Sequence, residues 1–239
     1  MIGCDCAVCI STDKKDKRLR SSILVQSAKT ALVVDTGPDF RYQMLRQKVK
    51  HLDAVVFTHP HKDHLAGLDD VRAFNFFSKK HIDIYADSLT EEAVRRDFYY
   101  AFTDTKYPGI PELNLHTISD EPFVVGDIPI IPVQVWHLKM PVLGFRFGKF
   151  TYITDANRID DIEKDKIRNS EVLVLNALRK QKHISHFTLD EAMEMAAEVK
   201  AGTAYFTHLS HQMGKHGEIE AELPDNIHLA YDGLELTFS

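Results

Sequence analysis

The sequence has 239 residues, a length that suits one large domain or two small ones, and we favour a single domain over residues 1–239. Hydrophobic residues make up 44% and charged residues 27%, and no apolar stretch approaches the roughly 20 residues of a membrane span. The net charge is −6, and basic residues cluster only at Lys14–Arg20, which argues against a broad surface for a long nucleic acid. No secretory signal pattern opens the chain, so we expect a cytoplasmic protein with no membrane partner.

Eight short apolar runs, each bounded by turn residues, predict β-strands. They lie at Ile23–Val25, Ala31–Val34, Ala54–Phe57, Ile82–Tyr85, Ile128–Val135, Phe150–Ile153, Val172–Leu175 and Ala204–Phe206. Apolar residues at helical spacing predict helices between several runs, one over Leu65–Phe74 and another over Ala192–Val199. The pairs Ser88–Glu91 and Thr188–Glu191 each fit a capping box at a helix start. Helices alternating with strands predict an α/β fold.

One segment, 87–107, is rich in aromatic residues and allows two interpretations. Its rings could form a lid or the surface of a homodimer, or they could belong to a helix face packed into the core, which we favour. The prolines and the glycine of 103–113, TDTKYPGIPEL, predict a loop there.

The pattern H-x-H-x-D-H follows the apolar run that ends at Phe57, and it is the strongest sign of chemistry in the sequence. In extended backbone His59 and His61 point the same way, whereas Asp63 and His64 enter the next helix and can face a second point nearby. This spacing favours two adjacent metal ions over a histidine-rich surface turn. Two metals need more than four ligands.

Further donors stand at the ends of later strands. His137, Asp155 and His208 each directly follow a predicted strand. Each alone could be a surface or capping residue, but three such coincidences favour ligands of the same site.

All three cysteines, Cys4, Cys6 and Cys9, fall in the segment CDCAVC near the start of the chain. An odd number at this close spacing suits one metal ion better than a disulfide framework. The three thiolates still lack a fourth ligand.

Taken together, H-x-H-x-D-H and the strand-end His, Asp and His in that order resemble the metallo-β-lactamase superfamily of metal-dependent hydrolases, over nearly the whole chain. The resemblance implies an α/β fold of four layers, an αββα sandwich. Within the superfamily, GCDCAVC and THLSH resemble the PhnP phosphodiesterase branch. Members normally begin with a strand before the cysteines, whereas this chain begins at Met1-Ile2-Gly3-Cys4, so we expect the usual N-terminal strand to be missing.

The resemblance also implies the roles of individual residues. One metal would be held by His59, His61 and His137, the other by Asp63, His64 and His208, with Asp155 bridging the two. Asp35 would orient a ligand histidine, with a simple turn aspartate as the alternative. A separate structural zinc would be held by Cys4, Cys6, Cys9 and His211, with His216 as the rival fourth ligand.

We expect His186 to act as a general acid or to contact phosphate, because it stands just before the predicted helix start at Thr188. His183 could take this role instead, or both could decorate a solvated loop. Asp63, Asp155 and His186 are our candidate catalytic residues.

The expected reaction is hydrolysis of a small, cyclic phosphodiester through a metal-bridging hydroxide. The resemblance implies two Zn²⁺ or Mn²⁺ ions at the active site and one structural Zn²⁺. The alternatives are a nuclease of the tRNA 3′-processing type, which would be expected to carry a basic arm, and a non-hydrolytic metal- or ligand-binding protein of the PqqB type.

Overall fold

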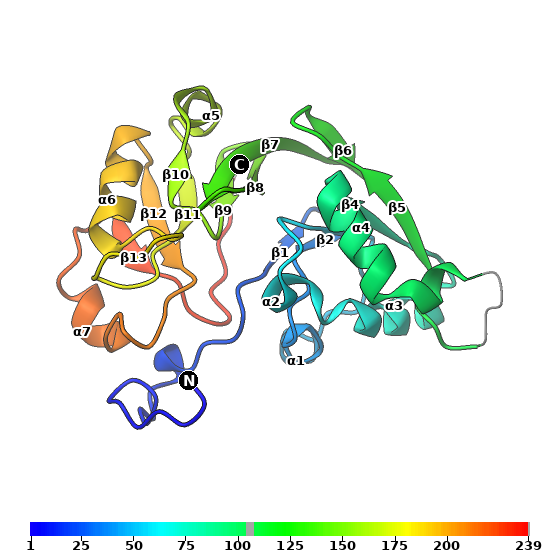
Figure 1. Ribbon diagram of the computed structural model, residues 1–239, viewed down its shortest axis with the longest axis horizontal. Coiled ribbons are helices and arrows are strands. Elements are labelled where there is room, and N and C mark those ends of the chain that lie inside the picture. The colour runs from blue at the N-terminus through cyan, green and yellow to red at the C-terminus, as the bar shows by residue number, and fades with distance from the viewer. Residues whose placement is uncertain (104–107, 239) are drawn as a thin grey trace. The chain divides into compact units, whose positions relative to one another are not determined.

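The computed structural model describes residues 1–103 and 108–238 and divides the chain into two compact units (Figure 1). We call Arg20–Ile130 the middle unit, and Met1–Leu19 with Ile131–Ser239 the terminal unit. Each unit contains a β-sheet with its own helices, and each has its own apolar core. None of the helices in the described part of the chain has both the length and the apolar character needed to cross a membrane.

The sheet of the middle unit has the strand order β1-β2-β3-β4-β5. Its strands are β1 (Ile23–Gln26), β2 (Ala31–Val34), β3 (Ala54–Val56), β4 (Ile82–Ala86) and β5 (Leu113–Thr117). β1 and β2 are antiparallel, and β2 to β5 run parallel. All residues of β2 and β3 are buried, so both faces of these strands are covered, as is typical of parallel strands.

The helices of this unit are α1 (Phe40–Arg46), α2 (Lys62–Leu65), α3 (Arg72–Ser78) and α4 (Ser88–Asp97), with the short 3₁₀ helices η2 (Leu68–Val71) and η3 (Tyr99–Phe102). Phe40, Leu68 and Val94 from these helices pack in one core with Val55 and Ile84 of the strands. The predicted helix over Leu65–Phe74 is therefore broken into α2, η2 and α3.

The sheet of the terminal unit has the order β10-β7-β8-β9-β11-β12-β13. β6 (Phe123–Val125) pairs with the first residues of β7, and these paired residues lie at the end of the middle unit. Its strands are β7 (Ile128–His137), β8 (Met140–Phe147), β9 (Phe150–Ile153), β10 (Arg158–Ile159), β11 (Val172–Asn176), β12 (Thr203–Thr207) and β13 (Ile227–Leu229). β9, β11, β12 and β13 are parallel, whereas β10, β7, β8 and β9 are joined by antiparallel pairs.

Three helices belong to the terminal unit: α5 (Asp161–Ile167), α6 (Leu189–Glu198) and α7 (His216–Glu220). The 3₁₀ helix η1 (Lys14–Asp16) lies in the N-terminal segment, and the first described strand is β1 at Ile23. Ala192, Met195, Ala196 and Val199 are all buried in the core, at the helical spacing that the sequence has.

All eight predicted strands are present, and so is the capping box of Thr188 and Glu191. The other predicted box is wrong. The residue that caps α4 is Asp87, whose carboxylate accepts from the backbone N–H of Thr90, and Ser88 is the first residue of the helix.

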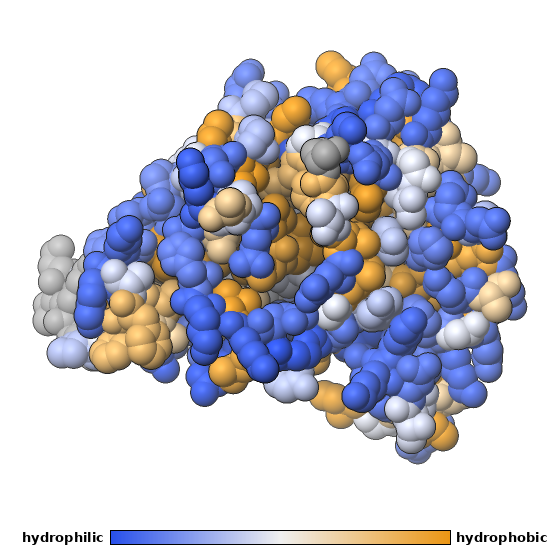
Figure 2. Space-filling view, turned by 180° about the vertical axis from the view of Figure 1, so that it is seen from behind, coloured by the Kyte–Doolittle hydropathy of each residue, from blue (hydrophilic) through white to orange (hydrophobic). Residues whose placement is uncertain are grey.

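The aromatic segment lies mostly against the core of the middle unit. Phe98 is buried, Tyr100 and Phe102 pack against the core cluster, and Tyr99 is exposed. Tyr107 and part of the predicted loop lie outside the described residues. The core interpretation is therefore confirmed for three of the rings. Other apolar side chains do reach the surface, where they lie between hydrophilic ones (Figure 2).

Candidate metal centres

In the middle unit, two chain segments that leave neighbouring strands come into close contact. The backbone N–H of Thr36, after β2, donates to the carbonyl of His64 at 2.7 Å, and the N–H of Gly67 donates to the carbonyl of Thr36 at 2.8 Å. A Cβ at Gly37 would lie 2.2 Å from the carbonyl oxygen of Asp63. Glycine is therefore required at this position if the histidine turn is to approach the loop after β2.

The buried carboxylate of Asp35 joins these two segments. Its Oδ2 lies 2.7 Å from Nδ1 of His64 and accepts from the hydroxyl of Thr58 at 2.8 Å, while Oδ1 accepts from the N–H of Thr58 at 2.9 Å. Burial raises the pKa of the Asp35 carboxyl, whereas His64 and Thr58 favour its charged form. Asp35 thus orients His64, as the predicted role requires.

Hydrogen bonding determines the tautomers of His59 and His64. The hydroxyl of Thr58 donates to Asp35, so its oxygen accepts from Nδ1–H of His59 at 2.9 Å. Nδ1 of His64 likewise carries the proton that Asp35 accepts. In both rings Nε2 is therefore the nitrogen that can serve as a metal ligand.

The remaining members of the motif lie beside them. The ring centroid of His59 is 4.6 Å from that of His61 and 4.3 Å from that of His64. Oδ2 of Asp63 lies 3.8 Å from Nε2 of His64 and 3.6 Å from the guanidinium of Arg20. The middle unit thus places the four donors of H-x-H-x-D-H in one cluster.

In the terminal unit, a second cluster forms around the buried Asp155. Ligand atoms of His137, Asp155 and His186 lie within 4.8 Å of one another, a separation that suits ligands of one metal ion. Oδ1 of Asp155 is 2.7 Å from Nε2 of His186 and 3.2 Å from Nε2 of His208. The three predicted donors of this unit, His137, Asp155 and His208, therefore come together.

The same hydroxyl arrangement recurs here. Thr154 donates to Oδ2 of Asp155 at 3.2 Å, so its oxygen accepts from Nδ1–H of His208 at 3.4 Å. Nδ1 of His137 donates to the carbonyl of Ser185 at 3.0 Å. Nε2 is again the nitrogen available for coordination in both rings.

His186 is buried and bonded, not displayed on a solvated loop. Its Nε2 lies 2.7 Å from Oδ1 of Asp155, while its Nδ1 lies 3.1 Å from the hydroxyl of Ser185 and 3.1 Å from Nδ1 of His183. Burial, followed by the charges of His186 and Arg179, lowers the pKa of His183. His183 thus contacts Nδ1 of His186, and it is His186 whose Nε2 contacts Asp155.

The sequence reading missed a residue that supports this cluster, the fully buried Asn176 at the end of β11. Its Oδ1 accepts from the N–H of Ala156 at 2.7 Å, and its Nδ2 donates to the carbonyl of Ala156 at 2.9 Å. The same carbonyl accepts from the N–H of Phe187 at 2.8 Å. Asn176 therefore holds the turn that brings Asp155 beside His186. A polar residue ending an otherwise apolar strand was the available signal.

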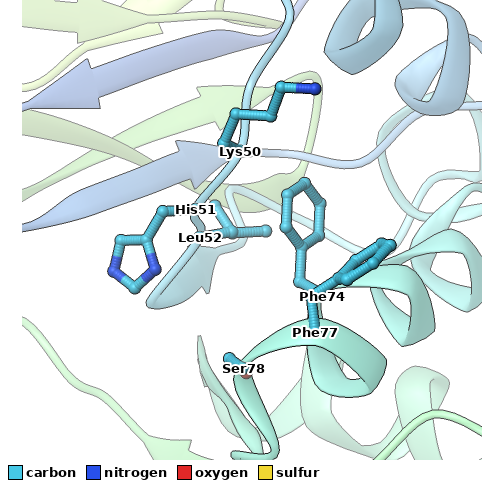
Figure 3. A pocket seen from close by; sticks show the side chains of 6 residues that line it. All are labelled: Lys50, His51, Leu52, Phe74, Phe77 and Ser78. Atoms are coloured by element: carbon cyan, nitrogen blue, oxygen red, sulfur yellow. The ribbon is translucent and has the colours of Figure 1, made fainter.

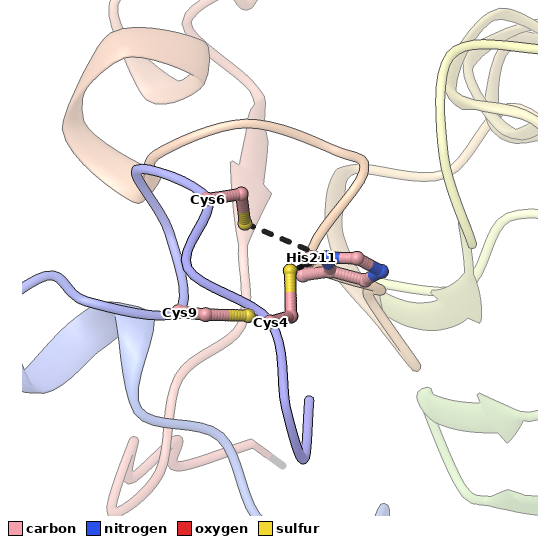
Figure 4. Close-up of side chains that lie close together, drawn as sticks. All are labelled: Cys4, Cys6, Cys9 and His211. Carbon is pink, nitrogen blue, oxygen red and sulfur yellow. Dashed lines mark hydrogen bonds between the residues drawn. The ribbon is translucent and has the colours of Figure 1, made fainter.

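A third cluster in the terminal unit contains Cys4, Cys6, Cys9 and His211 (Figure 4). Nδ1 of His211 is 3.4 Å from Sγ of Cys4 and 3.5 Å from Sγ of Cys6, and all four ligand atoms lie within 4.8 Å of one another. Tetrahedral zinc with bonds of about 2.0–2.3 Å separates its ligand atoms by roughly 3.5–3.8 Å, so this donor set fits zinc.

The electrostatics of this cluster favour thiolate at Cys6, whereas the pKa of the Cys4 thiol is raised. The backbone N–H of Cys9 and the ring of His211 lower the pKa of the Cys6 thiol to about 6. The N-terminal ammonium donates to Sγ of Cys9 at 3.0 Å. His216 is engaged elsewhere: its Nδ1 lies 3.1 Å from the guanidinium of Arg18, and its N–H donates to Asp16. The geometry therefore places His211, and not its rival, with the cysteines.

A concave pocket of about 140 Å³ in the middle unit contains none of the predicted site residues. It is lined by Lys50, His51, Leu52, Phe74, Phe77 and Ser78 (Figure 3). Among the described residues, the groups of side chains that could hold a metal lie in the three donor clusters instead.

An α/β fold with two sheets, with histidines and aspartates at the strand ends, defines a protein of the metallo-β-lactamase class. The chain belongs to the β-lactamase superfamily, whose domain model matches residues 30–209. The predicted fold class and the likeness to the PhnP branch are both confirmed.

Three similar proteins have names that state a function. The crystal structure of a diphosphatase from the PhnP family matches with a TM-score of 0.93 and 39% identity, covering 100% of this chain and 92% of that one. An octanoyltransferase of Porphyromonas gingivalis is 36% identical over 98% of this chain but 48% of its own length. The exodeoxyribonuclease WalJ of Streptococcus pneumoniae is 25% identical over 66% of this chain and 58% of its own. The chain thus spans about half the length of the curated relatives it matches.

Replacing the Asp35 carboxylate should weaken metal binding without unfolding the chain. In Asp35→Asn the amide can donate to Nδ1 of His64, which moves the ring proton to Nε2, the nitrogen needed for a metal. We expect the affinity for Zn²⁺ or Mn²⁺ to fall about 10–100-fold in a competition titration.

The matched control is Asp53→Asn, because Asp53 also pairs with a histidine, His51, at 2.7 Å but at the surface. Its affinity should equal that of the wild type. Equal metal affinity in Asp35→Asn and the wild type would show that Asp35 is only a turn aspartate.

Proposed function

We propose that this chain is a metal-dependent hydrolase that cleaves small phosphodiesters, of the cyclic kind that its resemblance to the PhnP branch implies. The observation that supports this most is the common tautomer of His59, His64, His137 and His208. Each has Nδ1 bonded to a protein oxygen, so that Nε2 is the potential ligand. Metal-binding histidines are typically oriented in this way.

The donor set fits the proposed cofactors. Histidine nitrogens and carboxylate oxygens without sulfur suit Zn²⁺ or Mn²⁺ at the active site, whereas three thiolates and a histidine suit a closed structural zinc site. The assignment of seven ligands to two active-site metals, with Asp155 between them, remains a prediction from the resemblance. When bound, such metals lower the pKa of a coordinated water toward about 7 and stabilise charge on a phosphoryl oxygen.

The protein's own residues supply orientation and proton transfer. Asp35 and Thr58 hold His59 and His64, and Thr154 holds His208 beside Asp155. We assign to His186 the role of donating a proton to the leaving oxygen, with Asp155 orienting its ring at 2.7 Å.

Two similar proteins support phosphorus–oxygen bond cleavage, since one is named a diphosphatase and another an exodeoxyribonuclease. A nuclease acting on a long strand is the second candidate, and the net charge of −6 favours a small anion instead. A protein that binds metal without hydrolysis is the third. The octanoyltransferase is a protein about twice as long as this chain.

Turnover of bis(p-nitrophenyl) phosphate by metal-loaded protein tests the proposal. Asp63→Ala removes a predicted ligand and should reduce kcat/KM by more than the roughly 10–100-fold typical of residues that only support a ligand. Asp161→Ala is the control, since that side chain is 97% exposed, and it should match the wild type. Metal-dependent binding of the ester without turnover would favour the non-hydrolytic alternative.

The cysteine cluster should hold one zinc independently of the active site. We expect Cys6→Ser and His211→Ala each to lose about one zinc per chain and to melt at a lower temperature, because structural zinc contributes directly to folding. His228→Ala, a histidine bonded to Glu220 in the same unit, should retain full zinc content. Unchanged zinc content in the first two variants, or a loss only in His216→Ala, contradicts the assignment.

The role of His186 can be separated from metal binding. As a general acid it should contribute about 10²–10⁴-fold to kcat on an alkyl phosphodiester, so His186→Ala should lose that factor. The loss should be smaller with a p-nitrophenolate leaving group, which needs little protonation. His183→Ala is the paired control. Metal loss in His186→Ala would instead make it a ligand, as its place beside His137 and Asp155 allows.

A further inference from the structure

Two exposed aliphatic side chains lie next to members of the Asp155 cluster. Leu138 is 51% exposed and directly follows His137, and Ile184 is 72% exposed and precedes Ser185 and His186. Single exposed aliphatic residues are common and by themselves indicate nothing. Leu138 and Ile184 differ from such isolated residues because a single side chain forms hydrogen bonds to both of the segments that contain them.

That side chain is the half-buried amide of Asn157. Its Oδ1 accepts from the N–H of Leu138 at 2.8 Å, and its Nδ2 donates to the carbonyl of Ile184 at 3.3 Å. The N–H of Asn157 itself donates to the carbonyl of Trp136 at 2.8 Å. One residue thus ties the turn after β7 to the loop before α6, and it fixes Leu138 and Ile184 relative to each other.

The backbone of Leu138 is strained as well as bonded. Its φ of +59° lies in the left-handed region, where a branched side chain is disfavoured and glycine or asparagine would be easier. Strained residues persist where surrounding structure holds them, and they concentrate at functional sites.

Both residues are close to the proposed chemistry. The carbonyl of Ser185, next to Ile184, accepts from His137, next to Leu138, and the rings of His137 and His186 lie 4.6 Å apart. Any phosphate ester held by the Asp155 cluster must extend its organic groups from this point. Leu138 and Ile184 are exposed apolar residues attached through the backbone to this cluster.

We propose that Leu138 and Ile184, positioned by Asn157, form an apolar rim that contacts the organic ester group of the substrate. The preferred substrates, cyclic or open, are then phosphodiesters whose organic part carries an aromatic or other apolar group, rather than inorganic diphosphate or short alkyl esters. This inference rests on the proposed phosphodiesterase function. Two side chains cover about one aromatic ring, whereas a stable second copy needs about 800 Å² per partner, which favours a substrate group as the occupant.

Two esters with the same leaving group test the rim. Bis(p-nitrophenyl) phosphate and methyl p-nitrophenyl phosphate both release p-nitrophenolate, so they differ only in the ester group that remains on phosphorus. We expect Leu138→Ser and Ile184→Ser each to lower the ratio of kcat/KM for the aryl ester over the methyl ester by about 3–10-fold. The loss should appear in the KM for the aryl ester.

Ile162→Ser is the matched control, because Ile162 is a 74% exposed isoleucine on α5 of the same unit, and it should keep the wild-type ratio. Asn157→Ala should lower the ratio as the rim variants do. Asn157→Asp, which keeps the acceptor for Leu138 but loses the donor to Ile184, should lower it less.

An unchanged ratio in both rim variants overturns the inference and leaves the phosphodiesterase proposal standing. Failure of the wild type to hydrolyse either ester overturns the proposed function itself. A dimer in size-exclusion chromatography that dissociates in the rim variants, with an unchanged ratio, assigns the surface to a second copy and also overturns the inference.

Discussion

A strand buried on both faces has no place for an uncompensated polar side chain, and this constraint places several donors of the two histidine and aspartate clusters just beyond strand ends. Asp35, Asp155 and His208 each lie where the chain leaves a strand, and all three have left-handed backbones, with φ values of 66°, 53° and 55°. This conformation costs roughly 1–2 kcal/mol for a residue with a Cβ. It turns the chain sharply, so each side chain stays at the end of its sheet. The hydrogen bonds of the side chains offset part of that cost.

Threonine hydroxyls at two strand ends connect the carboxylates to the histidines. Thr58 donates to Asp35 and accepts from His59, and Thr154 donates to Asp155 and accepts from His208. A hydroxyl can donate once and still accept, so one small buried residue satisfies a carboxylate and sets a tautomer at the same time. Valine has the same shape but would remove one hydrogen bond from each of the two partners, at a cost of about 0.5–1.5 kcal/mol each. The same arrangement of aspartate, threonine and histidine therefore occurs in each unit.

Most of the fold could be predicted because apolar runs bounded by turns encode buried strands locally. The strands that the sequence missed lack that signal: β5 (LNLHT) alternates polar and apolar residues at a sheet edge, β8 contains Pro141 and Gly144, β6 and β13 have three residues each, and β10 has two. The expected helix over Leu65–Phe74 is interrupted at Gly67, where a Cβ would lie 2.2 Å from the carbonyl oxygen of Gly37. That close approach joins residues distant in sequence, and helical periodicity contains no information about it. At the start of α4, Asp87 and Ser88 are both residue types that cap helices, and only the structure shows that Asp87 is the N-cap.

The donor residues could be predicted from the sequence because their residue types and their positions at strand ends indicate metal binding. The residues that orient these donors could not be predicted in this way. Asn176 and Asn157 are ordinary polar residues in the sequence, and each acts through bonds to backbone groups about 20 or more residues away. The same holds for substrate choice. In the proposed function the ligand residues allow a bond to phosphorus to be broken, whereas in the proposed rim the group attached to that phosphorus contacts Leu138 and Ile184, which carry no motif. A bridging amide and a strained leucine become informative only when the contacts around them are known, so specificity in this fold has to be read from three-dimensional structure.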